Sequence, residues 1–284
     1  MKRVRKTERQ QQILAELRLA PHVRISELAE RFGVSNETVR RDVDTLSEQG
    51  LVSRAYGGAA VAPMAMQPPF GERSKAHREE RMRIAERAAM LPQPGEVLMI
   101  DAGSTTSEFA RRLAVAGRDL TVLTNSIPVA GALGSNDAIT VILCPGAYSP
   151  SEAAVYGDET ISFIQRFRAN RVFIGASGVA VEGMMDANRA ASAVKRAMLR
   201  QCDERCLLVD QTKFNQRMLS IVEPLSVIDA LISDVAPQGP LLEALTNAGV
   251  RLINGSEAGT PPEEDAMAGC ATTVVHSRDA MPFD

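Results

Sequence analysis

Residues 26–58 carry the pattern that most constrains the fold, SELAERFGVSNETVRRDVDTLSEQGLVSRAYGG. A short amphipathic segment is followed by a glycine turn, a second amphipathic segment and a glycine-ended stretch that suits a hairpin. Ser26 and Ser35 stand where N-cap hydroxyls would satisfy free backbone N–H groups, and Gly33 suits the tight turn between two helices. This order is typical of a winged helix-turn-helix, which makes double-stranded DNA the first candidate partner.

The second predicted helix has one apolar face and one polar face. Val39, Val43 and Leu46 recur at positions i, i+4 and i+7 and form a single apolar stripe. At ~100° per residue, the opposite face carries Glu37, Thr38, Arg41 and Thr45, with Arg40 on its flank. We therefore expect this segment to be the recognition helix.

The chemistry of these side chains suits recognition in a DNA groove. Arg41 can donate two hydrogen bonds to guanine O6 and N7, Thr38 can contact a thymine methyl group, and Glu37 can accept from cytosine. Ser35, Arg40 and the helix N-terminus suit phosphate oxygens, which fix the register without reading the sequence.

The predicted wing, LVSRAYGG, adds two candidate contacts. Arg54 and Tyr56 can reach neighbouring phosphates or the minor groove. Residues 1–57 hold 11 Lys and Arg against 8 Asp and Glu, a net charge of +3 in a chain whose overall net charge is −3. The basic excess lies where DNA would bind, although its size alone decides little.

An alternative interpretation treats Arg40 and Arg41 as ordinary solvated helix charges. In that interpretation they pair with Asp42 and Asp44, which lie beside them in the sequence. It leaves the order of helix, turn, helix and wing unexplained.

The length of 284 residues and the composition of the chain favour two domains. Pro63, Pro68 and Pro69 interrupt the chain after the wing, and the charged stretch RSKAHREERMRIAERAAML is predicted to form a helix joining the domains. After about residue 255 the sequence is polar, rich in Pro and Gly and without periodicity, so a disordered tail is expected. The predicted boundaries are 1–60 for the winged helix-turn-helix domain, 61–92 for the linker and connecting helix, 93–255 for a second domain and 256–284 for the tail.

The second domain is predicted from seven apolar runs separated mostly by stretches of helical periodicity. The runs are VLMID, LTVLTN, AITVILC, RVFIGAS, CLLVD, VIDALISD and VRLIN. Continuous rather than alternating hydrophobicity indicates strands that are buried on both faces. The expected fold is a mainly parallel, Rossmann-like α/β sheet, in which ligands bind at the carboxyl ends of the strands.

Polar turns follow four of these strands and can converge on one small, anionic, polyhydroxyl molecule. The first turn, DAGSTT, offers a glycine, three hydroxyls and a helix N-terminus, which together suit a phosphate. Lys213 would supply positive charge, and Asp101 or Asp210 can accept from sugar hydroxyls. The candidate ligand residues are Asp101, Gly103, Ser104, Thr105, Thr106, Asn125, Ser126, Gly175, Ser177, Lys195, Asp210 and Lys213. Each turn taken alone can equally be a helix cap.

Neither a metal site, a cofactor nor a membrane span is expected. The four cysteines, Cys144, Cys202, Cys206 and Cys270, include no CxxC pair and no His at ligand spacing, so buried thiols in a reducing compartment are expected. No run of 18 or more apolar residues occurs, and the basic N-terminus does not lead into the apolar core of a signal peptide. We therefore expect a cytoplasmic protein.

The motifs, in their order, resemble those of the DeoR family of transcriptional regulators. They are VSNETVRRDVDTLSEQGLVSRAYGGA, IDAGSTT, VLTNS, FIGASG, DANRAASAVKRAM and VDQTKF, and the resemblance covers roughly residues 6–255. It implies a DNA-binding repressor of carbohydrate or related catabolic genes, not an enzyme, which works as a homodimer or homotetramer. Its C-terminal domain would be similar to ribose-phosphate isomerases and would sense a phosphorylated metabolite.

The resemblance also implies functional residues in this sequence. DNA contacts would fall on Ser35, Thr38, Arg40 and Arg41, and effector contacts on Asp101, Gly103, Ser104, Thr105, Asn125, Gly175, Ser177, Lys195 and Lys213. The sequence departs from the family pattern in the fifth motif. The family usually has acidic residues before the Lys of this motif, whereas this sequence has Ala190 and Ala191. The absence of a Glu at position 191 removes an acceptor and a candidate base, so a different effector or one missing polar contact is expected.

Two alternative functions remain open from the sequence. A sugar-phosphate isomerase-like enzyme with a DNA-binding appendage would use Asp101, Asp210 and Lys213 for acid–base chemistry, although a shared fold is poor evidence of catalysis. A regulator whose second domain serves mainly for oligomerisation, with its pocket lost or altered, would account for Ala190 and Ala191.

Overall fold

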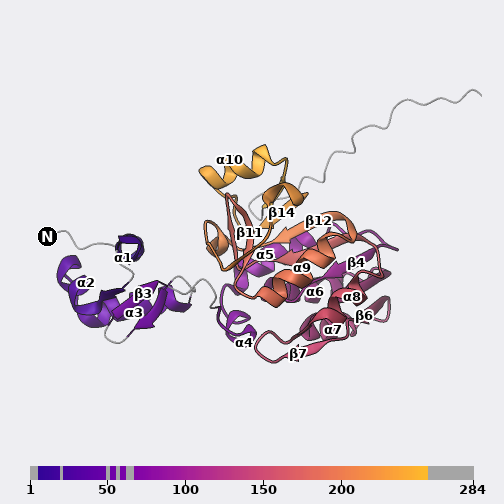
Figure 1. Ribbon diagram of the computed structural model, residues 1–284, viewed down its shortest axis with the longest axis horizontal. Helices are drawn as coiled ribbons and strands as arrows, with labels where there is room; N and C mark the ends of the chain where they lie inside the picture. The colour runs from indigo at the N-terminus through magenta and orange to yellow at the C-terminus, as the bar shows by residue number, and fades with distance from the viewer. Residues whose placement is uncertain (1–5, 20–21, 49–51, 56–57, 62–66, 255–284) are drawn as a thin grey trace, which may run out of the picture.

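The computed structural model describes residues 6–19, 22–48, 52–55, 58–61 and 67–254. Its N-terminal part contains the elements α1 (Lys6–Leu19), β1 (His22–Arg24), α2 (Ile25–Phe32), α3 (Asn36–Glu48), β2 (Val52–Ala55) and β3 (Gly58–Val61) (Figure 1). The three strands pair antiparallel in the order β1-β3-β2. The helices α2 and α3 are joined by a turn and followed by the β2–β3 hairpin, which pairs with β1, and this confirms the predicted winged helix-turn-helix.

The helix-turn-helix is built around a glycine and one serine cap. Gly33 ends α2 in the left-handed conformation, with φ 63° and ψ 37°, which a residue without a side chain adopts at little cost. Ser35 caps α3, since its hydroxyl oxygen accepts from the backbone N–H of Thr38 at 3.2 Å. The predicted cap at Ser26 is wrong, because β1 runs directly into α2 and the helix begins one residue earlier, at Ile25.

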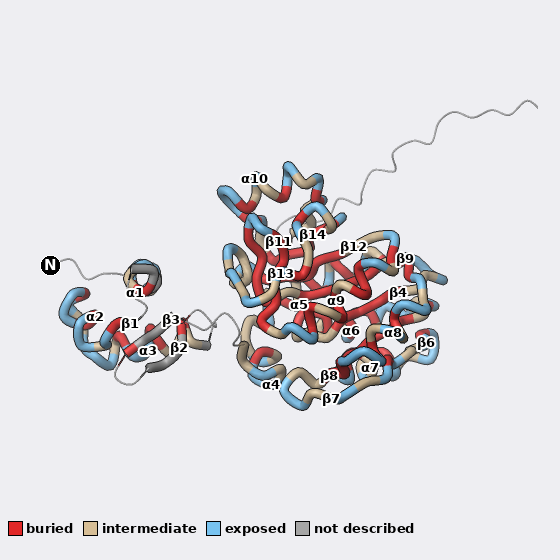
Figure 2. Tube along the Cα trace, in the orientation of Figure 1, coloured by how far each residue is buried: buried red, intermediate tan, exposed pale blue. Residues whose placement is uncertain are grey.

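The second domain contains a sheet of seven parallel strands, as the seven apolar runs predicted. The strands are β4 (Val97–Ile100), β5 (Leu120–Thr124), β6 (Ile139–Leu143), β9 (Ala169–Gly175), β12 (Cys202–Leu208), β14 (Ala230–Ser233) and β15 (Arg251–Asn254). Their order in the sheet is β15-β14-β12-β9-β4-β5-β6. Figure 2 shows this sheet as mostly buried chain inside the domain.

Helices cover both faces of this sheet. One face packs against α5 (Arg78–Ala88), α6 (Ser104–Val115) and α7 (Ile127–Leu133), and the other against α8 (Asp158–Ile164), α9 (Arg189–Leu199) and α10 (Pro240–Asn247). Successive strand residues point to opposite faces, so Leu98 and Ile100 belong to one core while Met99 belongs to the other. The helix predicted in the charged stretch is α5. Its apolar side packs in the core that also contains Leu98 and Ile100.

Short antiparallel elements, which periodicity did not predict, lie at the carboxyl edge of the sheet. They are the hairpin of β7 (Ala147–Ser149) and β8 (Ala154–Tyr156) and the sheet of β10 (Gly178–Ala180), β11 (Gly183–Asp186) and β13 (Ser220–Glu223). Runs of three or four residues are too short for a periodic signal. The short helix α4 (Phe70–Arg73) precedes α5.

The strand order changes direction between β4 and β9. From β4 the chain proceeds through β5 to β6 at one edge, whereas from β9 it proceeds through β12 and β14 to β15 at the other. In open α/β sheets, ligands bind in the crevice at the carboxyl ends of the strands where such a change occurs. The residues that follow β4, starting at Asp101, and those that end β9, at Gly175, therefore form the expected binding edge.

Candidate functional site

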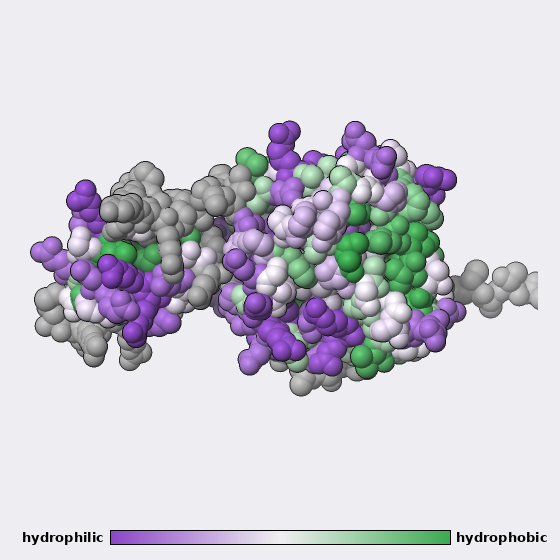
Figure 3. All heavy atoms as spheres, turned by 90° about the horizontal axis from the view of Figure 1, so that it is seen from below, coloured by the Kyte–Doolittle hydropathy of each residue, from purple (hydrophilic) through white to green (hydrophobic). Residues whose placement is uncertain are grey.

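The apolar stripe of α3 is confirmed, and the opposite face is open to solvent. Val39, Val43 and Leu46 are buried in the small core of the N-terminal domain. Glu37, Arg40 and Arg41 are exposed, and Thr38 and Thr45 are partly exposed. Figure 3 shows hydrophilic side chains gathered on the described surface of this domain.

The two arginines of α3 differ in their partners. Arg41 Nε lies 3.3 Å from Glu37 Oε1, and both side chains are more than half exposed. The side chain of Arg40 makes no hydrogen bond or ion pair within the described part of the chain. Asp42 is buried and pairs with Arg9 of α1, so the alternative that assigned Asp42 to the surface arginines is wrong.

The remaining predicted DNA contacts are described only in part. Ser35 Oγ and Thr38 Oγ1 lie 2.9 Å apart at the N-terminus of α3, where both are near free helical N–H groups. Arg54 lies in β2, but its side chain is outside the described residues, as is the whole of Tyr56.

A pocket lies at the carboxyl edge of the large sheet. Seven of the predicted ligand residues line it: Gly103, Ser104, Thr105, Gly175, Ser177, Lys195 and Lys213. The other five, Asp101, Thr106, Asn125, Ser126 and Asp210, are not part of the lining. Eight further residues complete the wall: Gln67, Arg73, Ala102, Glu152, Tyr156, Ala176, Asp186 and Ala191.

One wall of the pocket is the N-terminus of α6. The helix follows Gly103, which has extended backbone and no capping side chain, and its first intrahelical bond is the one Ser107 donates to Gly103. The N–H groups of the preceding residues are therefore free to bind an anion. Thr106 is fully buried and donates to the carbonyl oxygens of Asp101 and Gly103. These bonds stabilise the turn between β4 and α6.

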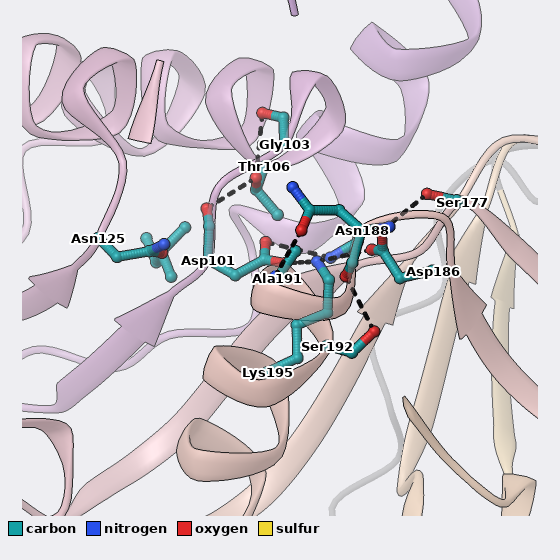
Figure 4. Close-up of polar contacts among 12 residues, drawn as sticks. Asp101, Gly103, Thr106, Asn125, Ser177, Asp186, Asn188, Ala191, Ser192 and Lys195 are labelled. Carbon is teal, nitrogen blue, oxygen red and sulfur yellow. Dashed lines mark hydrogen bonds and ion pairs between the residues drawn. The ribbon is translucent and has the colours of Figure 1, made fainter. Parts of the chain in front are cut away.

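A buried ion cluster forms the floor of the pocket (Figure 4). Lys195 of α9 pairs with Asp101 and lies 3.6 Å from Asp186 Oδ2. Asp101 Oδ1 also accepts from the N–H of Gly175 at 3.2 Å, and Asp186 Oδ1 accepts from Ser177 Oγ at 3.2 Å. These bonds join the ends of β4, β9 and β11 to α9.

Two carboxylates surround the single ammonium group of this cluster. Burial alone would lower the pKa of Lys195, but the carboxylates of Asp101 and Asp186 outweigh burial and raise it, so the ammonium is charged at neutral pH. Asp101 is committed to Lys195 and to a backbone N–H, and it lies beneath the lining. Asp186, which the sequence did not single out, supplies the second carboxylate because β11 ends there.

Lys213 is the remaining cation of the predicted set. It ends a 3₁₀ turn (Gln211–Lys213), and its side-chain ammonium makes no hydrogen bond or ion pair among the described residues. Burial lowers the pKa of Lys213, the carboxylate of Asp210 opposes this effect, and Arg81 and Arg73 add to it. Asp210 itself caps the turn by accepting from the N–H of Thr212 at 3.1 Å.

Asn125 and Ser126 hold elements in place rather than facing the pocket. Asn125 Nδ2 donates to the carbonyl of Val155 at 3.0 Å, and Val155 N–H donates back to the carbonyl of Asn125 at 2.9 Å. Ser126 caps α7 by accepting from the N–H of Val129. The sequence correctly placed both residues at a strand end, but their partners are backbone groups.

The residues that sequence reasoning missed come mostly from elements without periodicity. Gln67 and Arg73 belong to the segment before α5, and Glu152 and Tyr156 belong to the hairpin of β7 and β8. Ala191 lines the pocket as a buried side chain, so the departure from the family pattern falls in the wall itself. The resemblance to the DeoR pattern had already singled out this position, where a Glu is usual.

Two kinds of feature are absent from the described residues. No group of three or more His, Cys, Asp or Glu side chains there could hold a metal ion. No helix among the described elements is long and apolar enough to cross a membrane. Cys144, Cys202 and Cys206 are buried free thiols, and Cys270 lies outside the described residues.

Comparison with known proteins gives matches along most of the chain. The glycerol-3-phosphate regulon repressor of Escherichia coli K12 is 30% identical over 250 residues, 88% of this chain and 99% of that protein. The HTH-type transcriptional repressor GlcR of Bacillus subtilis is 30% identical over 239 residues, 83% of this chain and 92% of that protein. Ribose 5-phosphate isomerase A from Methanocaldococcus jannaschii matches with a TM-score of 0.37 and 16% identity, over 49% of this chain and 55% of that one.

Two family models match in succession. The DeoR-like helix-turn-helix domain matches residues 9–63. The DeoR C terminal sensor domain matches residues 76–235, which include the whole floor of the pocket. The chain therefore belongs to the DeoR family.

Proposed function

We propose that this protein is a transcriptional repressor that binds operator DNA through α3 and releases it when a phosphorylated, hydroxyl-bearing metabolite occupies the pocket. The exposed polar face of α3 and the order of the winged helix-turn-helix support DNA binding. Relatives that carry the word repressor in their names, one of them for a glycerol-3-phosphate regulon, support repression and a phosphorylated effector. The protein would act in the cytoplasm, where its operator lies.

The observation that carries the effector half of this proposal is the environment of Lys213. The other two cations of the pocket wall are occupied, Lys195 by Asp101 and Asp186 and Arg73 by Glu152. Lys213 has no partner among the described residues, and the free N–H groups of α6 line the same pocket. An unpaired cation next to a helix N-terminus suits a phosphate monoester.

The geometry favours sensing over catalysis. Asp101, a candidate base, is buried beneath the lining and bound to Lys195. Asp210 is committed to capping the 3₁₀ turn, and Ala191 supplies no acid. A general base must reach the proton it removes, and neither of these two candidate carboxylates lies at the pocket surface. The carboxylates that do line the pocket, Glu152 and Asp186, are paired with Arg73 and Lys195. We therefore expect no turnover of ribose 5-phosphate.

Regulation requires coupling between the pocket and α3. Two copies of the chain would place two recognition helices in successive major grooves, and the effector would favour an arrangement in which they no longer fit. A coupling free energy of about 1–3 kcal/mol changes operator affinity roughly 5- to 150-fold, which is enough to switch a gene.

The test is fluorescence anisotropy on DNA upstream of the protein's own gene and of its neighbours. Titrations are repeated with inorganic phosphate, sn-glycerol 3-phosphate, ribose 5-phosphate and the unphosphorylated sugars. Specific binding that one phosphorylated compound releases is the expected result. If the unphosphorylated sugars released the operator equally well, the role given to phosphate would be contradicted.

A matched pair of variants isolates Lys213. Lys213→Met should abolish release while leaving operator affinity unchanged, because the substitution removes the only unpaired cation of the described wall. Arg166→Met removes an exposed cation that does not line the pocket and should behave as the wild type. Equal responses of the two variants would contradict the phosphate site.

A further inference from the structure

The segment that leaves the DNA-binding domain contributes directly to the pocket. We call residues 67–75 the strap. Gln67 Oε1 accepts from Ser177 Oγ at 2.8 Å, at the end of β9. Phe70 N–H donates to the carbonyl of Ser151 at 2.7 Å, in the turn between β7 and β8. Figure 1 shows α4, the helix of the strap, beside β7.

A buried ion pair ties the strap to the same hairpin. Arg73 donates to both carboxylate oxygens of Glu152, at 3.2 Å and 2.7 Å, and also to the carbonyl of Pro68 at 2.6 Å. The side chains of Arg73 and Glu152 are 8% and 14% exposed, so the pair is shielded from water. Each carboxylate oxygen keeps acceptor capacity beyond its bond to Arg73, and Glu152 lines the pocket.

Tyr156 presents an unsatisfied hydroxyl in this part of the wall. The residue is only 7% exposed, lines the pocket and ends β8. Its hydroxyl has no hydrogen-bond partner among the described residues. Buried hydroxyls nearly always have a partner, so one without a protein partner at a pocket wall indicates a ligand group.

Hydrogen bonds hold Tyr156 in place, and its surroundings keep its hydroxyl protonated. The two bonds between Asn125 and Val155 fix β8 against the end of β5. Burial raises the pKa of the Tyr156 phenol, and the nearby carboxylates of Glu152 and Asp101 raise it further. The hydroxyl is therefore neutral at physiological pH and can both donate and accept.

We propose that Tyr156, Glu152 and Gln67 form a second subsite of the pocket, which binds the carbon-borne hydroxyl groups of a polyhydroxylated phosphomonoester. The proposal rests on the proposed function, because the phosphate end of the ligand is assigned to α6 and Lys213. Glu152 accepts from a ligand hydroxyl, and Tyr156 donates to or accepts from another. Arg73 is a positioning residue that holds Glu152 in place.

This subsite also places the ligand against the route to the DNA-binding domain. Gln67 and Arg73 belong to the strap, and Arg81 of α5 holds the end of the strap to the second domain by donating to the carbonyls of Arg73 and Ala76. A ligand hydroxyl that donates to Gln67 Oε1 or to Glu152 competes with the hydrogen bonds that hold the strap. Recognition of the hydroxyl groups and release of the operator therefore use the same residues.

The test is Tyr156→Phe, which removes the hydroxyl and keeps the buried ring. Binding is measured by calorimetry with ribose 5-phosphate and sn-glycerol 3-phosphate, which carry carbon hydroxyls, and with methyl phosphate, which carries none. We expect about three- to tenfold weaker binding of the two hydroxylated esters and unchanged binding of methyl phosphate. Tyr148→Phe, at an exposed tyrosine of β7 outside the lining, is the matched control and should change neither.

Stability measurements keep the result interpretable. The melting temperature of Tyr156→Phe without ligand should equal or exceed that of the wild type, since no protein hydrogen bond is lost. Equal losses for hydroxylated and hydroxyl-free esters, or no loss for either, would overturn the subsite while leaving the phosphate site intact. If the wild type bound none of the esters yet still bound its operator, the effector half of the proposed function would fail as well.

Discussion

The two functional regions of this protein arrange their charges in opposite ways. On the outer face of α3, Glu37, Arg40 and Arg41 are exposed, with the Arg40 side chain unpaired within the described chain and Arg41 only loosely paired with Glu37. In the pocket, Lys195 and Arg73 are buried and bound to carboxylates. Water stabilises a charge on the surface, whereas a buried charge needs a partner.

The difference separates the tasks of the two surfaces. Exposed arginines can stay unpaired until a phosphate or base arrives, so they suit a partner as highly charged as DNA. In the pocket, by contrast, most charged side chains form ion pairs with one another. One cation, the side chain of Lys213, has no partner in the described residues. A small ligand can then be recognised by one charge and a few placed hydroxyl contacts.

The largest expected effect is the loss of the buried ion pair. Lys195→Met leaves Asp101 and Asp186 buried without their cation, which should lower the free energy of unfolding by about 3–5 kcal/mol. The double variant Lys195→Met/Asp101→Asn should recover much of this loss. Urea denaturation followed by circular dichroism measures both.

A surface pair provides the control for this comparison. Arg112 and Glu86 lie 2.6 Å apart, but their side chains are 39% and 53% exposed. Arg112→Met should therefore cost no more than about 1 kcal/mol. If Lys195→Met cost as little as Arg112→Met, the contrast between buried and exposed charges would not hold.

The sequence predicted the α3 surface well because every signal there is local. The stripe of Val39, Val43 and Leu46, the turn at Gly33 and the cap at Ser35 depend on residues a few positions apart. The seven buried strands could also be predicted, since each is a continuous apolar run. Only the cap at Ser26 failed, because a strand ends where the helix begins.

The pocket was predicted on one wall and missed on the other. DAGSTT, Gly175, Ser177 and Lys213 follow recognisable strands, so their convergence could be inferred. Gln67, Arg73, Glu152 and Tyr156 lie in a strap and a short hairpin whose positions depend on long-range bonds, such as Arg73 to Glu152. No local pattern in the sequence encodes the pairing of residues 79 positions apart.

The next largest effect is expected at the recognition helix. Arg41→Ala should weaken operator binding by about 1–3 kcal/mol and relax the preference at one base pair, because a bidentate contact to guanine would be lost. Anisotropy titrations against operators with single base changes measure the loss of preference. Equal weakening on operator and random DNA would show that Arg41 contacts phosphate instead.

A pH dependence of effector binding tests the unpaired charge of the pocket. Burial lowers the pKa of Lys213 below its ordinary 10.5, and a bound phosphate would raise it again. The protonated lysine binds the phosphate, so affinity should fall as pH rises through the lowered pKa, by at most about tenfold per pH unit. Calorimetry with ribose 5-phosphate from about pH 7, where its phosphate is already a dianion, should show this fall.

Lys213→Arg is the variant that separates this lysine from other titrating groups. An arginine stays protonated throughout this range, so the fall in affinity with pH should disappear. A fall of the same size in Lys213→Arg would assign the titration to another group and remove the support for Lys213 as the phosphate cation.

The smallest expected effect is at Arg40. A phosphate contact carries no sequence information, so Arg40→Ala should weaken binding equally on operator and random DNA, and the slope of log K against log[salt] should decrease by about 0.9. Arg111→Ala, which changes an exposed arginine paired with Glu108 on α6, should leave the slope unchanged. A loss of base preference in Arg40→Ala would exchange the roles of the two neighbouring arginines, because the exposed face of α3 offers both of them to the groove.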